Sequence, residues 1–197
     1  MGASAGGLTA LVTVLASLPD PFPVAIALVL HLSPDHRSYL PEVLSRGAGR
    51  QVVWAKDGSP MRAGAIYAAP PGRHVVIDDH GETLLTTSRR VHFSRPSVDR
   101  LFTSAARTFG RRVIAVVLTG TGIDGAAGAL VVRRAGGVVI AQDEASSEYF
   151  SMARETIESG AATFVLPLGA IAAVVARLVA DGVAPNVGLG HDELQAI

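Results

Sequence analysis

The chain has 197 residues, of which 49% are hydrophobic and 17% are charged, a composition that favours one folded domain with a continuous core and excludes extensive disorder. The formal net charge is zero and the arginine pairs are spread along the sequence, which excludes the concentrated basic surface of a nucleic-acid-binding protein. Cysteine is absent, so the chain has neither a disulfide framework nor a thiol nucleophile.

No segment of the sequence has the character of a signal peptide or of a membrane-spanning helix. The unbroken apolar runs, such as 24–30, are much shorter than the roughly 18 residues that a membrane span requires. We therefore expect a cytoplasmic protein that does not insert into a membrane and does not bind nucleic acid.

The first part of the sequence alternates between helical and strand-like segments. Apolar runs bounded by glycine or proline are typical of buried parallel strands, and the segments between them have helical spacing. We predict, in chain order, a helix at 7–18, a strand at 24–30, a helix at 38–45 and a strand at 51–54. This alternation indicates βαβ units.

The middle of the sequence favours antiparallel pairing. Three short apolar segments are separated by the turn residues Pro70-Pro71-Gly72 and Asp79-His80-Gly81. We predict strands at 65–69, 74–77 and 83–87, joined as hairpins.

The remaining sequence returns to the βαβ pattern. Pro96 and Gly110 delimit one helix, because proline suits the first turn and glycine follows the last. The predicted elements are a helix at 96–109, a strand at 113–118, a helix at 124–134, a strand at 138–141, a helix at 153–159, a strand at 163–166 and a helix at 168–180. The fold class is α/β, a mainly parallel sheet flanked by helices with an antiparallel hairpin portion. We expect one domain over 1–182 and a flexible tail over 183–197.

A possible nucleophile lies at the very start of the sequence. Gly2-Ala3-Ser4-Ala5-Gly6 matches G-x-S-x-G, in which a serine lies on a sharp turn between a strand and a helix. The pattern alone is equally consistent with a glycine-rich turn in which Ser4 caps the helix at 7–18. Only Met1 precedes the motif, so we expect the strand that should present Ser4 to be missing, with its residues upstream of Met1.

Two further residues follow predicted parallel strands. His31 comes directly after the strand at 24–30, and Asp124 lies in a glycine-rich loop after the strand at 113–118. Because active sites of α/β sheets lie beyond the carboxyl ends of strands, we expect Ser4, His31 and Asp124 to meet there. Serine needs an imidazole to accept its proton, and the imidazole needs a carboxylate to fix its tautomer. The pattern predicts a serine hydrolase in which His31 is the general base and Asp124 orients it.

The loop before Asp124 also offers a place for a developing oxyanion. Its glycines allow close approach of backbone N–H groups, and Thr121 or a neighbour could supply one. Structural roles stay open beside these, since His31 could be a hydrogen-bonding residue at a strand end and Asp124 a helix cap.

Six stretches of the sequence match one enzyme family in the family's own order. They are Gly2-Ala3-Ser4-Ala5-Gly6-Gly7, the strand ending in His31, Ala69-Pro70-Pro71-Gly72-Arg73-His74, Arg95-Pro96-Ser97-Val98-Asp99, Val117-Leu118-Thr119-Gly120-Thr121-Gly122-Ile123-Asp124-Gly125 and Ile140-Ala141-Gln142-Asp143-Glu144-Ala145. From Gly2 to about Leu178 the chain resembles the catalytic domain of the CheB-type protein-glutamate methylesterases of chemotaxis receptors. The resemblance is to a stand-alone catalytic domain, because no receiver segment precedes Ser4.

The resemblance implies a doubly wound, mainly parallel sheet and hydrolysis of glutamate γ-methyl esters on the cytoplasmic helices of chemoreceptors, with deamidation of glutamine in some members. Carried over by position, Ser4 attacks the ester, His31 moves the proton, Asp124 orients His31, and Thr121 contributes its backbone N–H to the oxyanion hole. No cofactor and no metal are implied. Expected partners are methylated chemoreceptor helices or related signalling proteins, with a separate receiver protein as a further candidate.

Two departures from the family pattern bear on the substrate. Thr121 stands where the family usually has methionine, and Ser151-Met152-Ala153 replaces a Gly-Met-Pro segment. We expect the fit of the substrate to differ accordingly.

Two other classes of protein compete with the esterase. Residues 120–125 match the dinucleotide-binding pattern G-x-G-x-x-G, with Asp143 after the next strand as a ribose-binding acid. That alternative leaves Ser4 and His31 unexplained and sets the Asp124 carboxylate against a pyrophosphate. A catalytically inert module that binds signalling partners is the second alternative.

Asp35, His36, His74 and Asp99 have weaker functional interpretations. His31, Asp35 and His36 could ligate zinc, although solvated capping roles suit the latter two better. His74 and Asp99 could belong to the surroundings of the site, with surface or cap roles as the simpler expectation.

Overall fold

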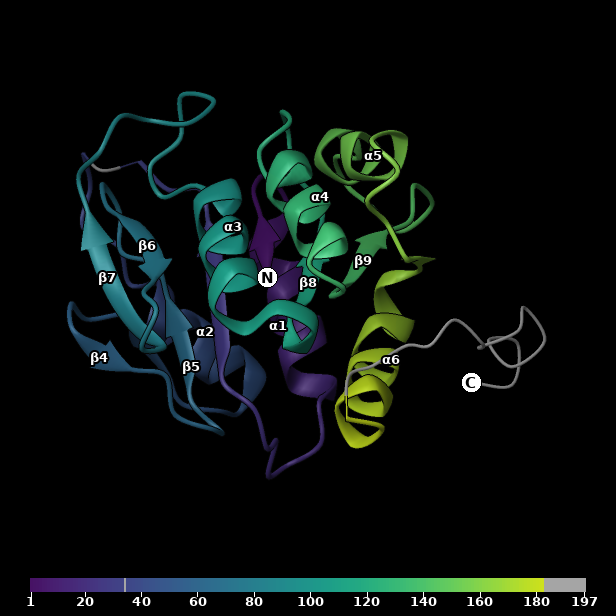
Figure 1. The fold of residues 1–197 in the computed structure, drawn as a ribbon, viewed down its shortest axis with the longest axis horizontal. Helices are drawn as coiled ribbons and strands as arrows, with labels where there is room; N and C mark the ends of the chain where they lie inside the picture. The colour runs from purple at the N-terminus through teal and green to yellow at the C-terminus, as the bar shows by residue number, and fades with distance from the viewer. Residues whose placement is uncertain (34, 183–197) are drawn as a thin grey trace.

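The computed structural model describes residues 1–33 and 35–182, so the predicted tail at 183–197 lies outside the described residues. Within them, a central sheet of seven strands runs in the order β10-β9-β8-β1-β2-β5-β3, and every neighbouring pair is parallel (Figure 1). The bounds are β1 Gly2–Ala3, β2 Ile26–Leu30, β3 Val52–Trp54, β5 Ile66–Ala68, β8 Ile114–Val117, β9 Val138–Gln142 and β10 Phe164–Leu166. The sheet confirms the expected mainly parallel α/β class.

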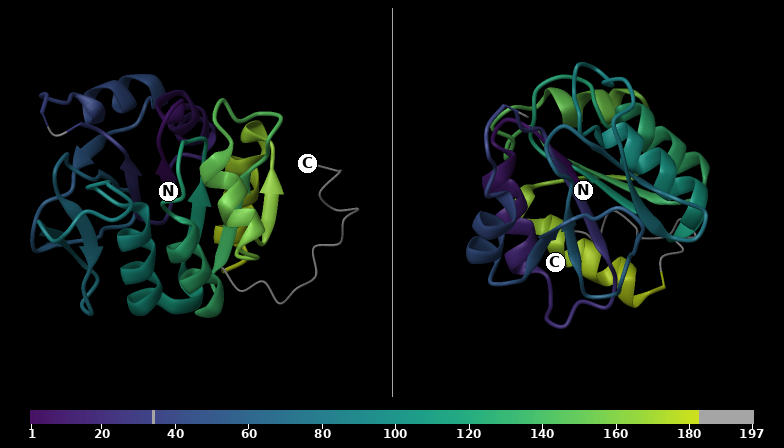
Figure 2. Two further views of the ribbon diagram at one scale, coloured as in Figure 1. Left: turned by 90° about the horizontal axis from the view of Figure 1, so that it is seen from above. Right: turned by 90° about the vertical axis from the view of Figure 1, so that its left-hand side faces the viewer.

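The helices of the described residues form two layers, one on each face of the sheet, as Figure 2 shows. One layer consists of α1 Gly7–Ser17, α2 Leu40–Ala48 and α6 Leu168–Ala180, and the other of α3 Val98–Phe109, α4 Ala126–Arg134 and α5 Ser151–Glu158. Strand β9 shows why both layers are needed. Val138 and Ile140 point into one core and Val139 into the other, and all three are fully buried. A strand buried on both faces is typically an almost continuous apolar run.

The antiparallel portion is smaller than the sequence suggests. It is a three-stranded sheet in the order β4-β7-β6, formed by β4 Ser59–Pro60, β7 Glu82–Thr86 and β6 His74–Ile77. The predicted strand at 65–69 does not belong to it, and that prediction is wrong. Its core, β5, pairs in parallel with β2 and β3 in the central sheet. Ile66, Tyr67 and Ala68 are all buried, which suits a strand between two neighbours better than a hairpin with one solvated face.

Three helices begin two residues later than predicted, α2 at Leu40 and the two helices beside the site. The helix predicted from Pro96 begins at Val98, because Ser97 is the N-cap and its hydroxyl accepts a hydrogen bond from the N–H of Arg100. The helix predicted from Asp124 begins at Ala126, with Gly125 as the N-cap. A polar side chain therefore lies just before each helix, Ser97 before α3 and Asp124 before α4, and the two side chains are hydrogen-bonded to each other.

The start of the chain forms a strand of two residues. β1 pairs with β2 on one side and with β8 on the other, so it occupies the middle of the sheet. The expectation that this strand is missing is corrected, because Gly2 and Ala3 form a short strand and Met1 contributes to the core.

None of the helices in the described residues is long and apolar enough to cross a membrane. This agrees with the short apolar runs of the sequence.

Candidate active site

Three adjacent strand ends bring distant parts of the sequence together. Ser4 follows β1, His31 follows β2 and Thr119 lies just beyond β8. The Ser4 N–H donates to the carbonyl of Thr119 over 3.0 Å, and the His31 N–H donates to the carbonyl of Ala3 over 3.3 Å. The strands thus deliver Ser4 and His31 to one edge of the sheet, where the sequence pattern predicted them.

Ser4 lies in a sharp turn that needs glycine on two sides. The Gly7 N–H donates to the carbonyl of Ser4 over 2.8 Å, and Gly6 has a φ of 73°, a conformation that favours glycine. Gly120, in the loop after β8, lies against the turn. A β-carbon at Gly120 would come within 2.8 Å of Ser4 Cβ and would overlap the sulfur of Met152. This close approach fixes the position of Ser4 relative to the loop that carries Asp124.

His31 and Asp124 form a direct contact. The Nε2 atom of His31 lies 2.8 Å from Oδ2 of Asp124, and the two side chains are 16% and 2% exposed. Nε2 is therefore committed to the carboxylate, and Nδ1 is the nitrogen left to accept a proton from serine. The Ser4 side chain is half-buried. Hydrogen bonds between nucleophile and base often tighten only when substrate binds.

The carboxylate of Asp124 is held by the amino terminus of helix α3. Its Oδ1 accepts hydrogen bonds from the Ser97 hydroxyl over 2.8 Å and from the Asp99 N–H over 3.1 Å, and its Oδ2 accepts one from the Val98 N–H over 2.7 Å. The first N–H groups of a helix have no partner within the helix and attract anions. Asp124 satisfies them from outside α3.

This environment keeps Asp124 ionised. Burial acts to raise the pKa of Asp124, but hydrogen bonds from His31, from the backbone of Asp99 and Val98 and from Ser97 outweigh burial and hold the pKa below its ordinary value. In a serine hydrolase, an ionised carboxylate in this position orients the histidine and stabilises the imidazolium that forms in the transition state.

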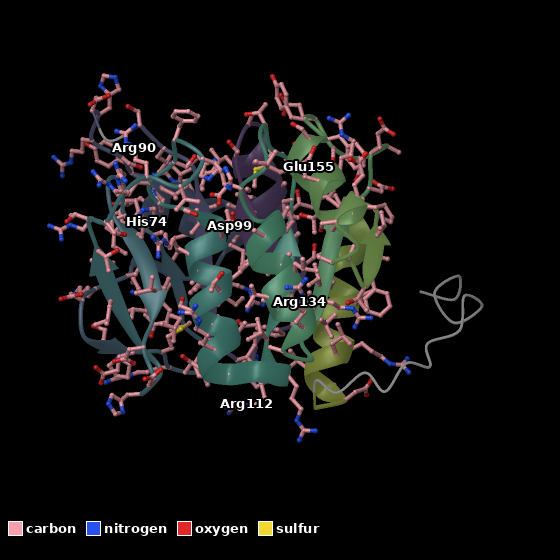
Figure 3. All side chains as sticks on the ribbon, turned by 45° about the horizontal axis from the view of Figure 1, so that its top comes forward. His74, Arg90, Asp99, Arg112, Arg134 and Glu155 are labelled. Atoms are coloured by element: carbon pink, nitrogen blue, oxygen red, sulfur yellow. The ribbon has the colours of Figure 1, made fainter. Side chains whose placement is uncertain are left out.

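Asp99 binds the neighbouring helix in the same manner. Its Oδ1 accepts hydrogen bonds from the Gly125 N–H over 3.0 Å and from the Gly128 N–H over 2.6 Å, at the start of α4, and Figure 3 labels its position. Burial raises the pKa of Asp99, helped by the charge of Asp124, while the two N–H groups and His92 act in the opposite direction. The expected cap role of Asp99 agrees with this geometry, but the helix it caps is not its own.

A buried network supports the turn that carries Ser4. The Thr119 hydroxyl donates to the carbonyl of Ala5 over 3.1 Å and accepts from the Tyr149 N–H over 2.9 Å, while the Thr119 N–H donates to Oε1 of Gln142 over 2.8 Å. Gln142 is fully buried, and its Nε2 donates to the carbonyl of Ser146 over 2.7 Å. The sequence analysis did not single out Thr119 or Gln142. A polar residue at the end of an otherwise apolar strand was the signal available for Gln142.

Thr121 lies on the exposed loop between β8 and α4. The loop leaves the sheet at Gly120, which packs against Ser4, and reaches Asp124 shortly before α4. The oxyanion role of the Thr121 N–H stays a prediction.

The other polar candidates have structural roles or lie apart. Asp35 is exposed and its Oδ2 accepts a hydrogen bond from the Ser33 hydroxyl over 3.1 Å. Among residues 1–33 and 35–182, no cluster of three His, Cys, Asp or Glu side chains is arranged to hold a metal ion. Because His31 is directed at Asp124, a zinc site with Asp35 and His36 is not formed.

His74 corrects the expectation of a surface or cap role. It is fully buried on β6, its Nε2 lies 3.1 Å from the carbonyl of Arg89, and its Nδ1 has no partner in the described part of the chain. Burial lowers the pKa of His74, and the charges of Arg100 and Arg95 lower it further against the effect of the hydrogen bond to Arg89.

The dinucleotide-binding alternative does not fit these contacts. Asp124, in the glycine-rich loop, already accepts four hydrogen bonds and caps α3 rather than leaving the loop open to a pyrophosphate. Asp143 accepts hydrogen bonds from the backbone and hydroxyl of Ser146 in its own loop.

A serine, a histidine and a buried carboxylate at the carboxyl edge of a doubly wound parallel sheet are the residue types expected of an α/β serine hydrolase. Comparison with known proteins identifies the family. The family model for the CheB methylesterase matches residues 1–175, and the chain belongs to that family.

The individual relatives agree with the family model. A protein-glutamate methylesterase/protein-glutamine glutaminase of Anaeromyxobacter dehalogenans is 46% identical over 171 residues, which are 87% of this chain and 50% of that protein. The protein-glutamate methylesterase FrzG of Myxococcus xanthus is 41% identical over 179 residues, covering 91% of this chain and 54% of that protein. The chain spans about half the length of the curated relatives it matches.

A solved structure confirms the fold. The crystal structure of the Thermotoga maritima CheB methylesterase catalytic domain matches with a TM-score of 0.86 and 34% identity, over 90% of this chain and 95% of that chain. The match supports the expectation from the sequence that this chain corresponds to a catalytic domain, and it confirms the resemblance to the CheB family.

Proposed function

We propose that this chain is a serine esterase that removes methyl groups from glutamate γ-methyl esters of chemoreceptors or related signalling proteins, and that it deamidates glutamine in the same site. The observation that carries the proposal is the 2.8 Å contact between His31 Nε2 and Asp124 Oδ2, beside a serine on the adjoining strand. The names of the relatives supply the substrate class, protein glutamate esters and glutamine amides.

The reaction begins at the serine hydroxyl. Ser4 Oγ attacks the ester carbonyl as its proton passes to Nδ1 of His31, and the resulting imidazolium is stabilised by Asp124 through Nε2. Collapse of the tetrahedral intermediate breaks the bond to methanol, which leaves with the proton from His31. The glutamyl group is then esterified to Ser4, and a water molecule activated by His31 releases it as a carboxylate.

Backbone N–H groups stabilise the oxyanion. Thr121 supplies one of them, from the loop between β8 and α4. One such donor typically contributes about 3 kcal/mol of transition-state stabilisation. Because this contribution comes from the backbone, the replacement of methionine by Thr121 preserves it and changes only the side chain that faces the substrate.

We assign the catalytic unit to residues 1–182. The partners are methylated cytoplasmic helices of chemoreceptors or of related signalling proteins, in the cytoplasm. A separate receiver protein is a candidate regulator.

Methanol release from methylated chemoreceptor fragments tests the function. The chain should release methanol, and Ser4→Ala should abolish release while retaining the circular dichroism spectrum and unfolding midpoint of the parent. If the folded parent releases no methanol but binds the fragments, the inert binding module replaces the esterase. The same fragments carrying glutamine in place of the methyl ester measure deamidation through ammonia release.

A further inference from the structure

A cavity lies beside the catalytic histidine. It has a volume of about 340 Å³ and is bounded by the segment after β2 and by the loop between β7 and α3. His31, Leu32, Arg90, Phe93, Arg95 and Pro96 contribute to its lining. Apart from His31, none of these lining residues takes part in the proposed catalytic steps, so their charge and shape require another explanation.

Arg95 is fixed in the wall of this cavity. Its Nη1 donates to the carbonyls of Thr87 and Ser88, over 2.8 and 3.1 Å. Its Nε is buried without an acceptor in the described residues. Two carbonyls thus hold the guanidinium group in place, and no carboxylate within residues 1–33 or 35–182 forms an ion pair with it. A guanidinium group that is held in place by backbone carbonyls and has no carboxylate partner is suited to bind a carboxylate.

Arg90 adds a second cation to the same cavity. It is exposed, and it too has no ion-pair partner among the described residues. Figure 3 labels Arg90 at the upper left, well apart from Arg134 near the middle of the view. The one carboxylate in the lining is Asp35, whose Oδ2 accepts the Ser33 hydroxyl. Two guanidinium groups against one carboxylate give the cavity a net positive charge.

The loop also presents an aromatic ring to solvent. Val91 and Ser94 pair with each other, and the two residues between them have positive φ, 47° for His92 and 63° for Phe93. This turn leaves Phe93 93% exposed. Positive φ is unfavourable for residues other than glycine, and an exposed ring gains nothing from folding. A contact between Phe93 and a binding partner at the cavity would account for the unfavourable backbone conformation and for the exposed ring.

We propose that this cavity is a subsite for an acidic side chain of the substrate, one helical turn away from the glutamate ester that Ser4 attacks. The proposal rests on the proposed function. Side chains three or four positions apart lie on the same face of a helix, so an ester at Ser4 and a carboxylate in the cavity can come from one helix. Arg95 and Arg90 bind the carboxylate, and Phe93 packs against an apolar side chain of the same helix. The favoured substrate is a methylated glutamate in an acidic, amphipathic helix.

Paired helical peptides test the subsite. Each carries one glutamate γ-methyl ester, with either glutamate or glutamine three or four positions to each side. The measured quantity is the ratio of kcat/KM for the glutamate peptide to that for the glutamine peptide, within each enzyme variant. For the parent enzyme the ratio should be about three to five, the effect of a partly exposed ion pair, and it should fall as salt is added.

Three variants decide the outcome. Arg95→Gln and Arg90→Gln should each bring the ratio toward one. Arg95→Gln also removes the hydrogen bonds to the carbonyls of Thr87 and Ser88 and could disturb the loop. Arg90→Gln tests the charge without that disturbance. Arg134→Gln removes the same charge at the far end of α4 and should leave the ratio unchanged. A parent ratio of one, or a ratio that survives both Arg95→Gln and Arg90→Gln, would overturn the subsite.

Binding separates the subsite from the esterase itself. The Ser4→Ala protein is titrated with both fluorescently labelled peptides, and the glutamate peptide should bind about three to five times more tightly than the glutamine peptide. Preferential binding without methanol release from the parent would support the subsite and refute the proposed function. Equal binding together with methanol release would support the esterase and overturn the subsite.

Discussion

Asp99 and Asp124 each hold the amino terminus of the other's helix. Asp124, just before α4, accepts the Val98 and Asp99 N–H groups of α3, and Asp99, in the first turn of α3, accepts the Gly125 and Gly128 N–H groups of α4. Asp99 replaces the side-chain cap that α4 lacks, and Asp124 adds to the local cap that Ser97 gives α3. The orientation of the residue that contacts His31 is therefore tied to the packing of two helices.

Removing the charge at Asp124 should affect catalysis and stability together. Asp124→Asn should lower kcat by about 10³- to 10⁴-fold, because the amide favours the wrong tautomer of His31. The loss of an anion at the start of α3 should also destabilise the fold by about 1 kcal/mol. Methanol release and urea unfolding measure the two effects, and an active Asp124→Asn enzyme would contradict the assignment.

Asp99 should act as a positioning residue. Asp99→Ala leaves the N–H groups of Gly125 and Gly128 without a partner, and it should lower the free energy of unfolding by about 2 to 4 kcal/mol. Because Asp124 then moves relative to His31, kcat should fall by about tenfold with little change in KM. Asp99→Asn keeps an acceptor oxygen and should recover most of both losses. A loss of stability without any change in kcat would reduce Asp99 to a purely structural residue.

Gly120 should not tolerate a side chain. Gly120→Ala places a β-carbon against Ser4 and the sulfur of Met152, so it should destabilise the fold by about 1 to 3 kcal/mol and lower kcat. Gly169→Ala is the matched control, because it lies in the first turn of α6 with no atom near its added β-carbon. The control should leave activity unchanged and should not lower the unfolding midpoint. Equal behaviour of the two variants would contradict the close approach.

Stability should fall as the pH drops below neutrality because of His74. Its folded-state pKa is lowered, so the unfolded chain binds a proton first as the pH falls through the ordinary value of about 6.5. The stabilising contribution is fully present above that pH and is lost as the pH falls toward the folded-state pKa. Urea unfolding at a series of pH values should show this slope, and His74→Gln should flatten it. An unchanged slope in that variant would assign the effect to another group.

Local patterns were sufficient to predict where the candidate site lies. His31 and Asp124 were found because each follows a buried apolar run, and parallel strands end at a shared edge. The same reasoning could not find the role of Asp99 or the partners of Asp124, because these depend on how α3 and α4 pack. Thr119 and Gln142 were missed for a similar reason, since their hydrogen bonds join three separate loops.

The errors in the fold have a related cause. Residues 65–69 were correctly predicted to be a strand, but the choice between a hairpin and the central sheet depends on partners far away in the sequence. β4 was not predicted, because its two residues include Pro60 and carry no periodic pattern. Helix α6 was predicted with the bounds it has, since Pro167 precedes a long apolar segment that needs no distant partner to define it.

The central position of β1 determines how the two parts of the sheet come together. Strands β2, β5 and β3 lie on one side of β1, and β8, β9 and β10 lie on the other, so the two contiguous halves of the sequence meet along a single seam. Ser4 and His31 belong to the first half and Asp124 to the second. Neither half contains all three residues of the proposed proton relay, so ester hydrolysis by the proposed mechanism requires both halves to be packed together.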